Sequence, residues 1–306
     1  MEIHKQEEGR FTPPRKSAAI DAMLKINPDH PIAQKYLEEF KEYGRIFTEF
    51  VNESRPKTNF VKPELKPIDP KHMYEVFQDN YKFIAVKEFD ETANDFEAQK
   101  LAGTLALYFI ENRSFYKSPL LCKNNDGTFK SVPELNKGIM IIGSYGTGKT
   151  SIIETFHHIF KYARNNSFHV KNKAGEFELL KWYEIYFAFS TANDVVREFE
   201  GIKRSDNPDE DFGWDQFWKK HSKGLRYYDD VMAEEKANNY GKIELFKQIF
   251  EKRYSNRTKT IISLNYVGDT VESTLEAFAE RYGERNYDRI FEMYNIIELK
   301  GESLRK

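Results

Sequence analysis

The sequence predicts an α/β protein with a parallel central sheet flanked by helices, preceded by a mainly helical N-terminal region. A glycine-rich phosphate-binding motif lies between an apolar run of strand length and a helical pattern. Further strand-length apolar runs then alternate with helical patterns up to the last residues, which is typical of a parallel sheet. With 306 residues, including 25 Phe and 18 Tyr, the chain is long enough to bury a large core.

Composition excludes several classes of protein. The formal net charge is −2, so any nucleic-acid site must be a local patch. The single cysteine, Cys122, excludes an intramolecular disulfide and fits a reducing, cytoplasmic location. No apolar run approaches about 20 residues, so we expect no contact with a membrane. The N-terminus lacks the apolar segment of a signal peptide.

The first 88 residues divide into two expected parts. Residues 1–30 are polar and contain Pro13, Pro14 and Pro28, which predicts a flexible arm. Residues 31–88 are expected to form a helical partner-binding region. Apolar residues recur at helical spacing over 31–51, and a shorter helix is expected over 71–81.

The phosphate-binding motif occupies residues 143–150 and reads G-S-Y-G-T-G-K-T. Glycines allow the backbone to wrap a polyphosphate with its N–H groups pointing inward, and the following helix directs its positive end at the same place. Lys149 can reach the β- and γ-phosphates, and Thr150 can place a hydroxyl on Mg²⁺. The residues expected to bind ATP are Gly143, Ser144, Tyr145, Gly146, Thr147, Gly148, Lys149, Thr150 and Ser151.

The remaining elements follow from apolar periodicity. A long helix is expected before the motif, over 92–112, and a hairpin or loop over 122–135. After the motif, strands are expected at 182–189, 225–230, 260–264 and 294–299. Helices are expected at 192–200, 243–254, 271–282 and 286–293, and an acidic loop at 207–215.

Two strand ends supply polar groups to the site. The expected strand at 225–230 ends in Asp229, which would bind Mg²⁺, and Asp230, which would orient or deprotonate the attacking water. The next strand ends in Asn265, which would reach the γ-phosphate or the water as a sensor. The alternative is that these residues form ordinary surface turns.

Basic residues give two weaker signals. Arg281, Arg285 and Arg289 recur every four residues, and such an arginine can act on a neighbouring subunit's γ-phosphate or belong to a solvated helix face. A cluster of aromatic and basic residues suits single-stranded DNA, unless its aromatics are core and its lysines solvated. The basic residues chosen from that cluster are Lys219, Lys220 and Arg226.

Together these motifs resemble the AAA+ ATPases of the DnaC/DnaI helicase-loader and IstB transposition-helper group. The resemblance rests on residues 143–150, on Tyr228-Asp229-Asp230 and on the strand that ends at Asn265. The runs Y-G-E-R-N-Y-D-R-I-F at 282–291 and G-E-S-L-R at 301–305 are its most specific part. It covers about residues 92–306 and does not extend to the first ninety.

The resemblance implies that residues 89–306 form an AAA+ ATPase domain that oligomerises around ATP. It also implies an arginine finger at Arg289, a neighbouring arginine of the same box at Arg285, and a sensor 2 residue at Arg305. The chain departs from the group's pattern after the acid pair, where D-D-V-M-A-E-E lacks a glycine, and near 209–223. These departures affect the DNA-contacting details more than the ATP site.

The resemblance thus favours a DnaC-like loader that uses ATP and Mg²⁺, binds single-stranded DNA and delivers a hexameric replicative helicase. An IstB-like helper with a transposase as partner is the first alternative. A small-molecule kinase is disfavoured by Asn265 and by the arginine box, whereas Asp230 in place of glutamate keeps a non-catalytic, ATP-gated scaffold open. The oligomer number, the adenine contacts and the arginine that acts between subunits stay undetermined.

Overall fold

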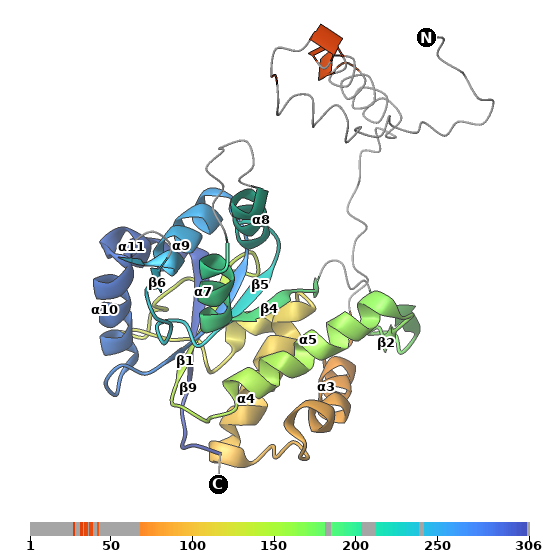
Figure 1. Ribbon diagram of the computed structural model, residues 1–306. Coiled ribbons are helices and arrows are strands. Elements are labelled where there is room, and N and C mark those ends of the chain that lie inside the picture. The colour runs from red at the N-terminus through yellow and green to blue at the C-terminus, as the bar shows by residue number, and fades with distance from the viewer. Residues whose placement is uncertain are drawn as a thin grey trace, which may run out of the picture. The chain divides into compact units, whose positions relative to one another are not determined.

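The computed structural model describes residues 68–180, 185–202, 212–238 and 242–304, together with residues 27, 31–32, 34–35, 37–38 and 42. The chain divides into two compact units, Met1–Glu64 and Leu65–Lys306, and we call the second the C-terminal unit (Figure 1). In the first unit, the described residues between 31 and 42 are helical. The expected arm, except residue 27, and most of the expected helix over 31–51 lie outside the described residues.

In the described residues, the C-terminal unit is built on a five-stranded sheet with the order β4-β5-β8-β1-β9. Every pair of neighbouring strands in it is parallel. The strands are β1 (Gly138–Gly143), β4 (Ala188–Thr191), β5 (Arg226–Asp229), β8 (Thr260–Asn265) and β9 (Tyr294–Leu299). Gly143 pairs with Asn265, and Thr191 with Asp229, so these strands end at one edge. Polar residues that follow different strands are thereby brought together.

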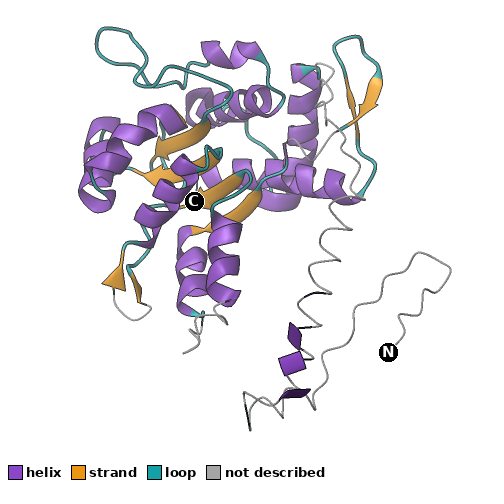
Figure 2. Ribbon diagram, turned by 90° about the horizontal axis from the view of Figure 1, so that it is seen from above, coloured by secondary structure: helices purple, strands orange, loops and turns teal. Residues whose placement is uncertain are grey.

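Helices cover both faces of the sheet (Figure 2). Alternation along β1 sends Ile139 and Ile141 into one apolar cluster and Met140 and Ile142 into the other. The first cluster contains residues of α3 (Pro70–Ala85), α4 (Ala93–Phe109) and α5 (Lys149–Asn165). The second contains residues of α7 (Ala192–Glu200), α8 (Phe212–His221), α9 (Leu245–Ser255), α10 (Val271–Tyr282) and α11 (Glu284–Met293). The predicted α/β class, a P-loop fold with a parallel central sheet flanked by helices, is confirmed.

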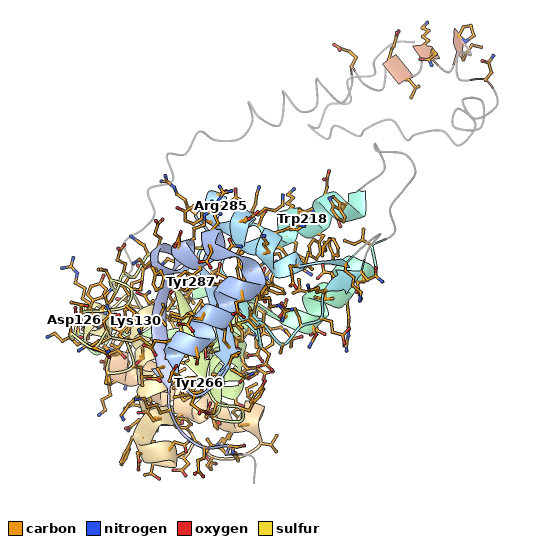
Figure 3. All side chains as sticks on the ribbon, turned by 90° about the vertical axis from the view of Figure 1, so that its left-hand side faces the viewer. Asp126, Lys130, Trp218, Tyr266, Arg285 and Tyr287 are labelled. Carbon is orange, nitrogen blue, oxygen red and sulfur yellow. The ribbon has the colours of Figure 1, made fainter. Side chains whose placement is uncertain are left out.

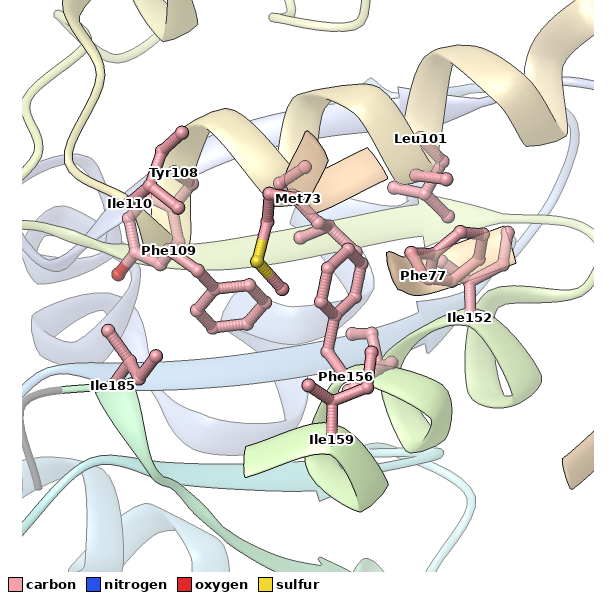
Figure 4. Packing of buried hydrophobic residues seen from close by; sticks show 14 of the residues in the cluster. Met73, Phe77, Leu101, Tyr108, Phe109, Ile110, Ile152, Phe156, Ile159 and Ile185 are labelled. Carbon is pink, nitrogen blue, oxygen red and sulfur yellow. The ribbon is translucent and has the colours of Figure 1, made fainter. Parts of the chain in front are cut away.

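Helix α3 belongs to the core of the C-terminal unit. Asp69 caps its first turn, and its apolar face lies against α5. Figure 4 shows Met73 and Phe77 directed toward Phe156, and the rings of Phe77 and Phe156 are stacked with centroids 4.9 Å apart. The expected division of the chain at residue 88 therefore falls inside this unit, which begins at Leu65.

Two expected elements differ in extent. The aromatic run at 182–189 was expected to be a strand, but β4 begins only at Ala188, and residues 181–184 lie outside the described residues. The side chain of Phe187, which precedes β4, is buried against Phe109 of α4, so the apolar character of this residue reflects packing rather than an extended strand. The expected loop at 207–215 overlaps the start of α8 at Phe212.

Smaller elements lie outside the main sheet. Strand β2 (His169–Lys171) pairs with β3 (Phe177–Leu179), and β6 (Ala237–Asn238) pairs with β7 (Lys242–Ile243), in both cases antiparallel. The short helix η1 spans Arg113–Lys117.

Candidate functional site: a P-loop with a strand-end acid pair

The loop between β1 and α5 has the backbone conformation that its glycines permit. Gly146 and Gly148 have φ angles of +75° and +95°, in the left-handed region that glycine tolerates best. Thr147 is buried and donates a hydrogen bond from its hydroxyl to the carbonyl oxygen of Ser144 at 2.9 Å. Helix α5 begins immediately afterwards at Lys149, so its N-terminal N–H groups and its dipole serve the loop.

Lys149 and Asn265 are in direct contact. The buried Nζ of Lys149 donates to the carbonyl oxygens of Gly143 and Ser144, at 2.8 and 2.7 Å, and to Oδ1 of Asn265 at 2.9 Å. The Nδ2 group of Asn265 in turn donates to Oδ1 of Asp230 at 2.9 Å. The asparagine therefore connects the P-loop lysine to the second acid.

Thr150 and Asp229 form a cluster of oxygen ligands. The hydroxyl of Thr150 lies 3.1 and 2.9 Å from the two carboxylate oxygens of Asp229. Mg²⁺ prefers such hard oxygen ligands and completes its shell with water and phosphate. The described residues contain no group of three His, Cys, Asp or Glu side chains that could hold a metal alone. The pair thus fits a magnesium ion that is bound together with a nucleotide.

Sequence reasoning missed two hydroxyl groups that orient the acids. Ser263 donates to Oδ1 of Asp229 at 2.6 Å, and its oxygen accepts the backbone N–H of Asp230 at 2.9 Å. The buried hydroxyl of Tyr227 also donates to Asp229. Burial, followed by the charge of Asp229, raises the pKa of Tyr227, so this phenol keeps its proton and remains a donor. Tyr227 and Ser263 lie on the same face of the sheet as Asp229. The alternation of side chains along each strand was the feature of the sequence that could have indicated this.

The turn after β5 is strained and is held by Arg281. Asp230 and Met232 have φ angles of +52° and +77°, which are uncommon for residues other than glycine. The guanidinium of Arg281 donates to the carbonyl oxygens of Met232 and Glu234 and lies 3.1 Å from a carboxylate oxygen of Glu234. Glu244 lies 3.3 Å from the Nε atom of Arg281. Helix α10 therefore fixes the turn that carries Asp230.

The C-terminal segment folds back onto the P-loop. The backbone N–H of Leu304 donates to the carbonyl oxygen of Gly146 at 2.9 Å. A Cβ atom on Gly146 would lie 2.2 Å from Oγ of Ser303. The side chain of Asn94 holds this segment through hydrogen bonds of 3.0 Å to the backbone N–H and carbonyl oxygen of Glu302. Arg305, the expected sensor 2 residue, lies outside the described residues.

A cavity of about 130 Å³ lies over the P-loop. Besides loop residues, it is lined by Asp230, Asn265 and Leu304, and by Tyr81 and Lys87 from α3 and the segment after it. Burial raises the pKa of Tyr81, and the neighbouring side chain of Ser151 opposes that shift. The contribution of α3 was not predicted, because periodicity indicates a helix but not the site beside which it packs.

Neither described arginine of the expected box lies beside this cavity. Arg285 is exposed at one end of α11 (Figure 3). The guanidinium of Arg289 lies 4.2 Å from the ring centroid of Tyr254, at the C-terminal end of α9. Arg289 lines a different cavity together with Gly138, which begins β1, whereas the P-loop follows the carboxyl end of that strand. Arg285 lies about one turn before Arg289 on α11.

The expected DNA patch on α8 is used largely for packing. Phe217 and Trp214 lie against Phe199, with ring centroids 5.2 and 4.9 Å apart. Arg226 is only 8% exposed and donates to the carbonyl oxygen of Lys220. Two lysines remain exposed on this helix: Lys220, which lies 2.7 Å from a carboxylate oxygen of Glu198, and Lys219.

Comparison with known proteins gives similarity in structure only. No model of a protein family and no curated protein matches the sequence. The crystal structure of the DnaC helicase loader is 23% identical, with a TM-score of 0.37, and the match covers 54% of this chain and 79% of that one. The DnaI structure is 18% identical, with a TM-score of 0.35 and coverage of 53% and 73%. AMPPCP-bound DnaA from Aquifex aeolicus is 17% identical, with a TM-score of 0.33 and coverage of 53% and 40%. At these TM-scores the comparisons add no weight to a functional assignment, which has to come from the site.

In the part of the chain that the structure describes, no helix is long and apolar enough to cross a membrane.

Proposed function

We propose that this protein is a DnaC-like, ATP-dependent helicase loader of DNA replication. In this proposal it binds ATP and Mg²⁺ as an oligomer, contacts single-stranded DNA and delivers a hexameric replicative helicase. The observation that carries the ATPase part is the hydrogen-bonded chain from Lys149 through Asn265 to Asp230, beside the Thr150–Asp229 pair. The choice of a loader rests on the motifs at 282–291 and 301–305.

The residues of the site divide the chemistry of hydrolysis. The P-loop N–H groups and Lys149 would hold the β- and γ-phosphates, and Thr150 with Asp229 would hold Mg²⁺, which neutralises charge on the phosphates. Asp230 would orient the attacking water and accept its proton. Asn265, in contact with both Lys149 and Asp230, would couple the lysine's position to that of the acid.

Completion of the site by a second copy is part of the proposal. Arg289 or Arg285 would stabilise the charge that develops on a neighbouring subunit's γ-phosphate, because neither lines the cavity over its own P-loop. Arg305 would act from the C-terminal segment that Leu304 attaches to the loop. The N-terminal unit, residues 1–64, would grip the helicase.

Two measurements test this proposal. ATP hydrolysis should depend on Mg²⁺ and should fall at least about a hundredfold in Asp230→Asn, with ATP affinity retained. A chain without hydrolysis but with ATP binding would be the ATP-gated scaffold instead. Capture from the native cell by Asp230→Asn, with ATP present, should recover a replicative helicase. Recovery of a transposase would favour the IstB-like alternative.

The truncation used as a control should end at residue 64. A deletion to residue 85 would remove α3 and with it part of the core, so lost capture would report unfolding rather than a lost contact. Removal of residues 1–64 should abolish capture while ATP binding persists. Capture that survives this truncation would contradict the proposed role of the N-terminal unit.

A further inference from the structure

A second cavity lies at the opposite edge of the sheet from the P-loop. Its volume is about 530 Å³, and Gly138, which begins β1, is one of its lining residues. Lys259 and Met293, which immediately precede β8 and β9, also line it. The length of β1 separates this cavity from the P-loop by roughly 16 Å, at about 3.3 Å per residue. A nucleotide in the P-loop of the same subunit therefore does not fill it.

The cavity is strongly basic in a chain whose formal net charge is −2. One carboxylate, that of Glu292, contributes to the lining and accepts a hydrogen bond from the hydroxyl of Tyr254 at 2.8 Å. The basic lining residues are Lys137, Arg253, Arg257, Lys259 and Arg289. Such an excess of positive charge in a concave site favours an anionic ligand.

The basic residues of the lining differ in how far their donor groups already bond to the protein. Arg253 is fully buried, and its donors are taken by Thr260 and by four backbone carbonyl groups. Lys137 donates to the carbonyl oxygen of Val132 at 2.7 Å. Lys259 is partly exposed, and its Nζ lies 3.9 Å from a carboxylate oxygen of Glu111.

Besides the partly exposed Lys259, two guanidinium groups can take part in binding a ligand. Among the described residues, neither Arg257 nor Arg289 has a carboxylate within ion-pair distance. Arg257 is exposed, and Arg289 lies over the ring of Tyr254. A stacked arginine and an aromatic ring beside further cations are the groups with which proteins bind single strands, because the cations contact phosphates and the planar groups stack on bases.

We infer that this cavity binds the phosphodiester backbone of single-stranded nucleic acid through Arg257 and Lys259, beside the Tyr254–Arg289 stack. The inference rests on the proposed function, in which the protein contacts single-stranded DNA, and it assigns that contact to the amino edge of the sheet rather than to α8. With Arg289 in this cavity, Arg285 is the arginine left for a neighbouring subunit's γ-phosphate. The ligand is a phosphate group, so free polyphosphate is the other possible source.

The test uses the full-length chain with ATP and Mg²⁺ present, so that the P-loop is saturated. Affinity for a fluorescently labelled thymidine oligonucleotide is measured across a range of salt concentrations for the wild type and for Arg257→Gln/Lys259→Gln. The matched control is Arg197→Gln, on α7, whose side chain is 79% exposed. None of the three changed residues lines the cavity over the P-loop, so ATP hydrolysis without DNA should stay at the wild-type rate in every variant.

The expected result follows from counterion release. Each phosphate contact to a single strand contributes about 0.7 to the slope of log affinity against log salt, so loss of two contacts should lower it by about 1.4. With equal affinities for the two proteins at about 1 M salt, where counterion release contributes nothing, the affinity of the double variant at about 0.1 M salt should be roughly 25-fold lower. The control should keep both the affinity and the slope.

Each other outcome overturns the inference in a distinguishable way. If the wild type binds the oligonucleotide and the double variant binds it equally well with the same slope, this cavity is not the DNA site, and the proposed function stands. If the wild type binds no oligonucleotide, the DNA-binding part of the proposed function fails together with the inference. If the double variant loses only calorimetrically measured binding of inorganic tripolyphosphate, the cavity takes free polyphosphate rather than a strand.

Discussion

Replacement of Phe77 by alanine should destabilise the C-terminal unit severely, although this residue lies in the segment that sequence reasoning assigned to the N-terminal region. The side chain is 0% exposed. Its ring centroid lies 4.9 Å from that of Phe156, on α5, and 5.1 Å from that of Phe89. The substitution therefore removes contacts within α3 and its flank as well as contacts to the helix that follows the P-loop.

The magnitude can be worked out from this burial. A Phe-to-Ala change in a close-packed core costs about 3–5 kcal/mol in the free energy of unfolding. For a unit of this size, each kcal/mol lowers the melting temperature by about 2–4 °C. The expected decrease is therefore roughly 6–20 °C.

The assay is thermal unfolding followed by circular dichroism. Phe83→Ala is the matched control, because Phe83 belongs to the same helix but is 68% exposed. It should change the stability by less than about 0.5 kcal/mol. Similar melting temperatures for the two variants would refute the reasoning, because they would mean that α3 does not pack on α5 in solution.

Three further predictions concern the site and its surroundings. Arg281→Gln should lower kcat for ATP roughly tenfold or more with little change in KM, because it frees the turn that carries Asp230, and Arg281→Lys should restore part of the rate. Ser263→Ala should raise the Mg²⁺ concentration needed for half-maximal hydrolysis by roughly tenfold to a hundredfold, since a hydrogen bond to a charged group contributes about 1.5–3 kcal/mol. The third concerns His221, which is fully buried. Burial is the main reason that its pKa falls from 6.5 to about 4, and it outweighs the opposing effect of Glu198. The unfolded chain binds this proton below about pH 6.5 and the folded chain does not, so stability should fall by about 2 kcal/mol between about pH 7 and about pH 5.

Controls separate these effects from general damage. For Arg281 and Ser263, wild-type melting temperatures together with wild-type kinetics would remove the assigned roles. For the histidine, urea unfolding at both pH values should show a flatter pH dependence in His221→Gln and an unchanged one in His169→Gln, because His169 is exposed. Equal slopes in the two variants would contradict the assignment.

The strand ends show why so much of the site was predictable. Lys149 and Thr150 belong to a motif whose spacing carries its chemistry, and Asp229, Asp230 and Asn265 each follow or end an apolar run. In a parallel sheet the carboxyl ends of the strands meet at one edge, so residues separated by more than 100 positions, such as Lys149 and Asn265, come into contact. The structure shows contacts among these residues, whereas their catalytic roles stay a proposal.

Arginines show the limit of sequence reasoning. Arg226, Arg253, Arg281 and Arg289 have the same chemistry in the sequence, yet two are buried, one supports the acid-bearing turn and one lies on a tyrosine ring. Which of these occurs depends on the carbonyl groups and rings that other segments bring within a few ångströms. Those neighbours leave no periodic trace along the chain.

The sequence by itself determined the α/β class, the P-loop and the polar groups at the strand ends, because local spacing and strand alternation encode them. Only the tertiary structure decided that α3 packs on α5, that Ser263 and Tyr227 orient Asp229, and that basic residues surround a cavity at the far edge of the sheet. The physical reason is that burial and hydrogen bonding depend on contacts between segments distant in sequence, and residue type alone does not specify them.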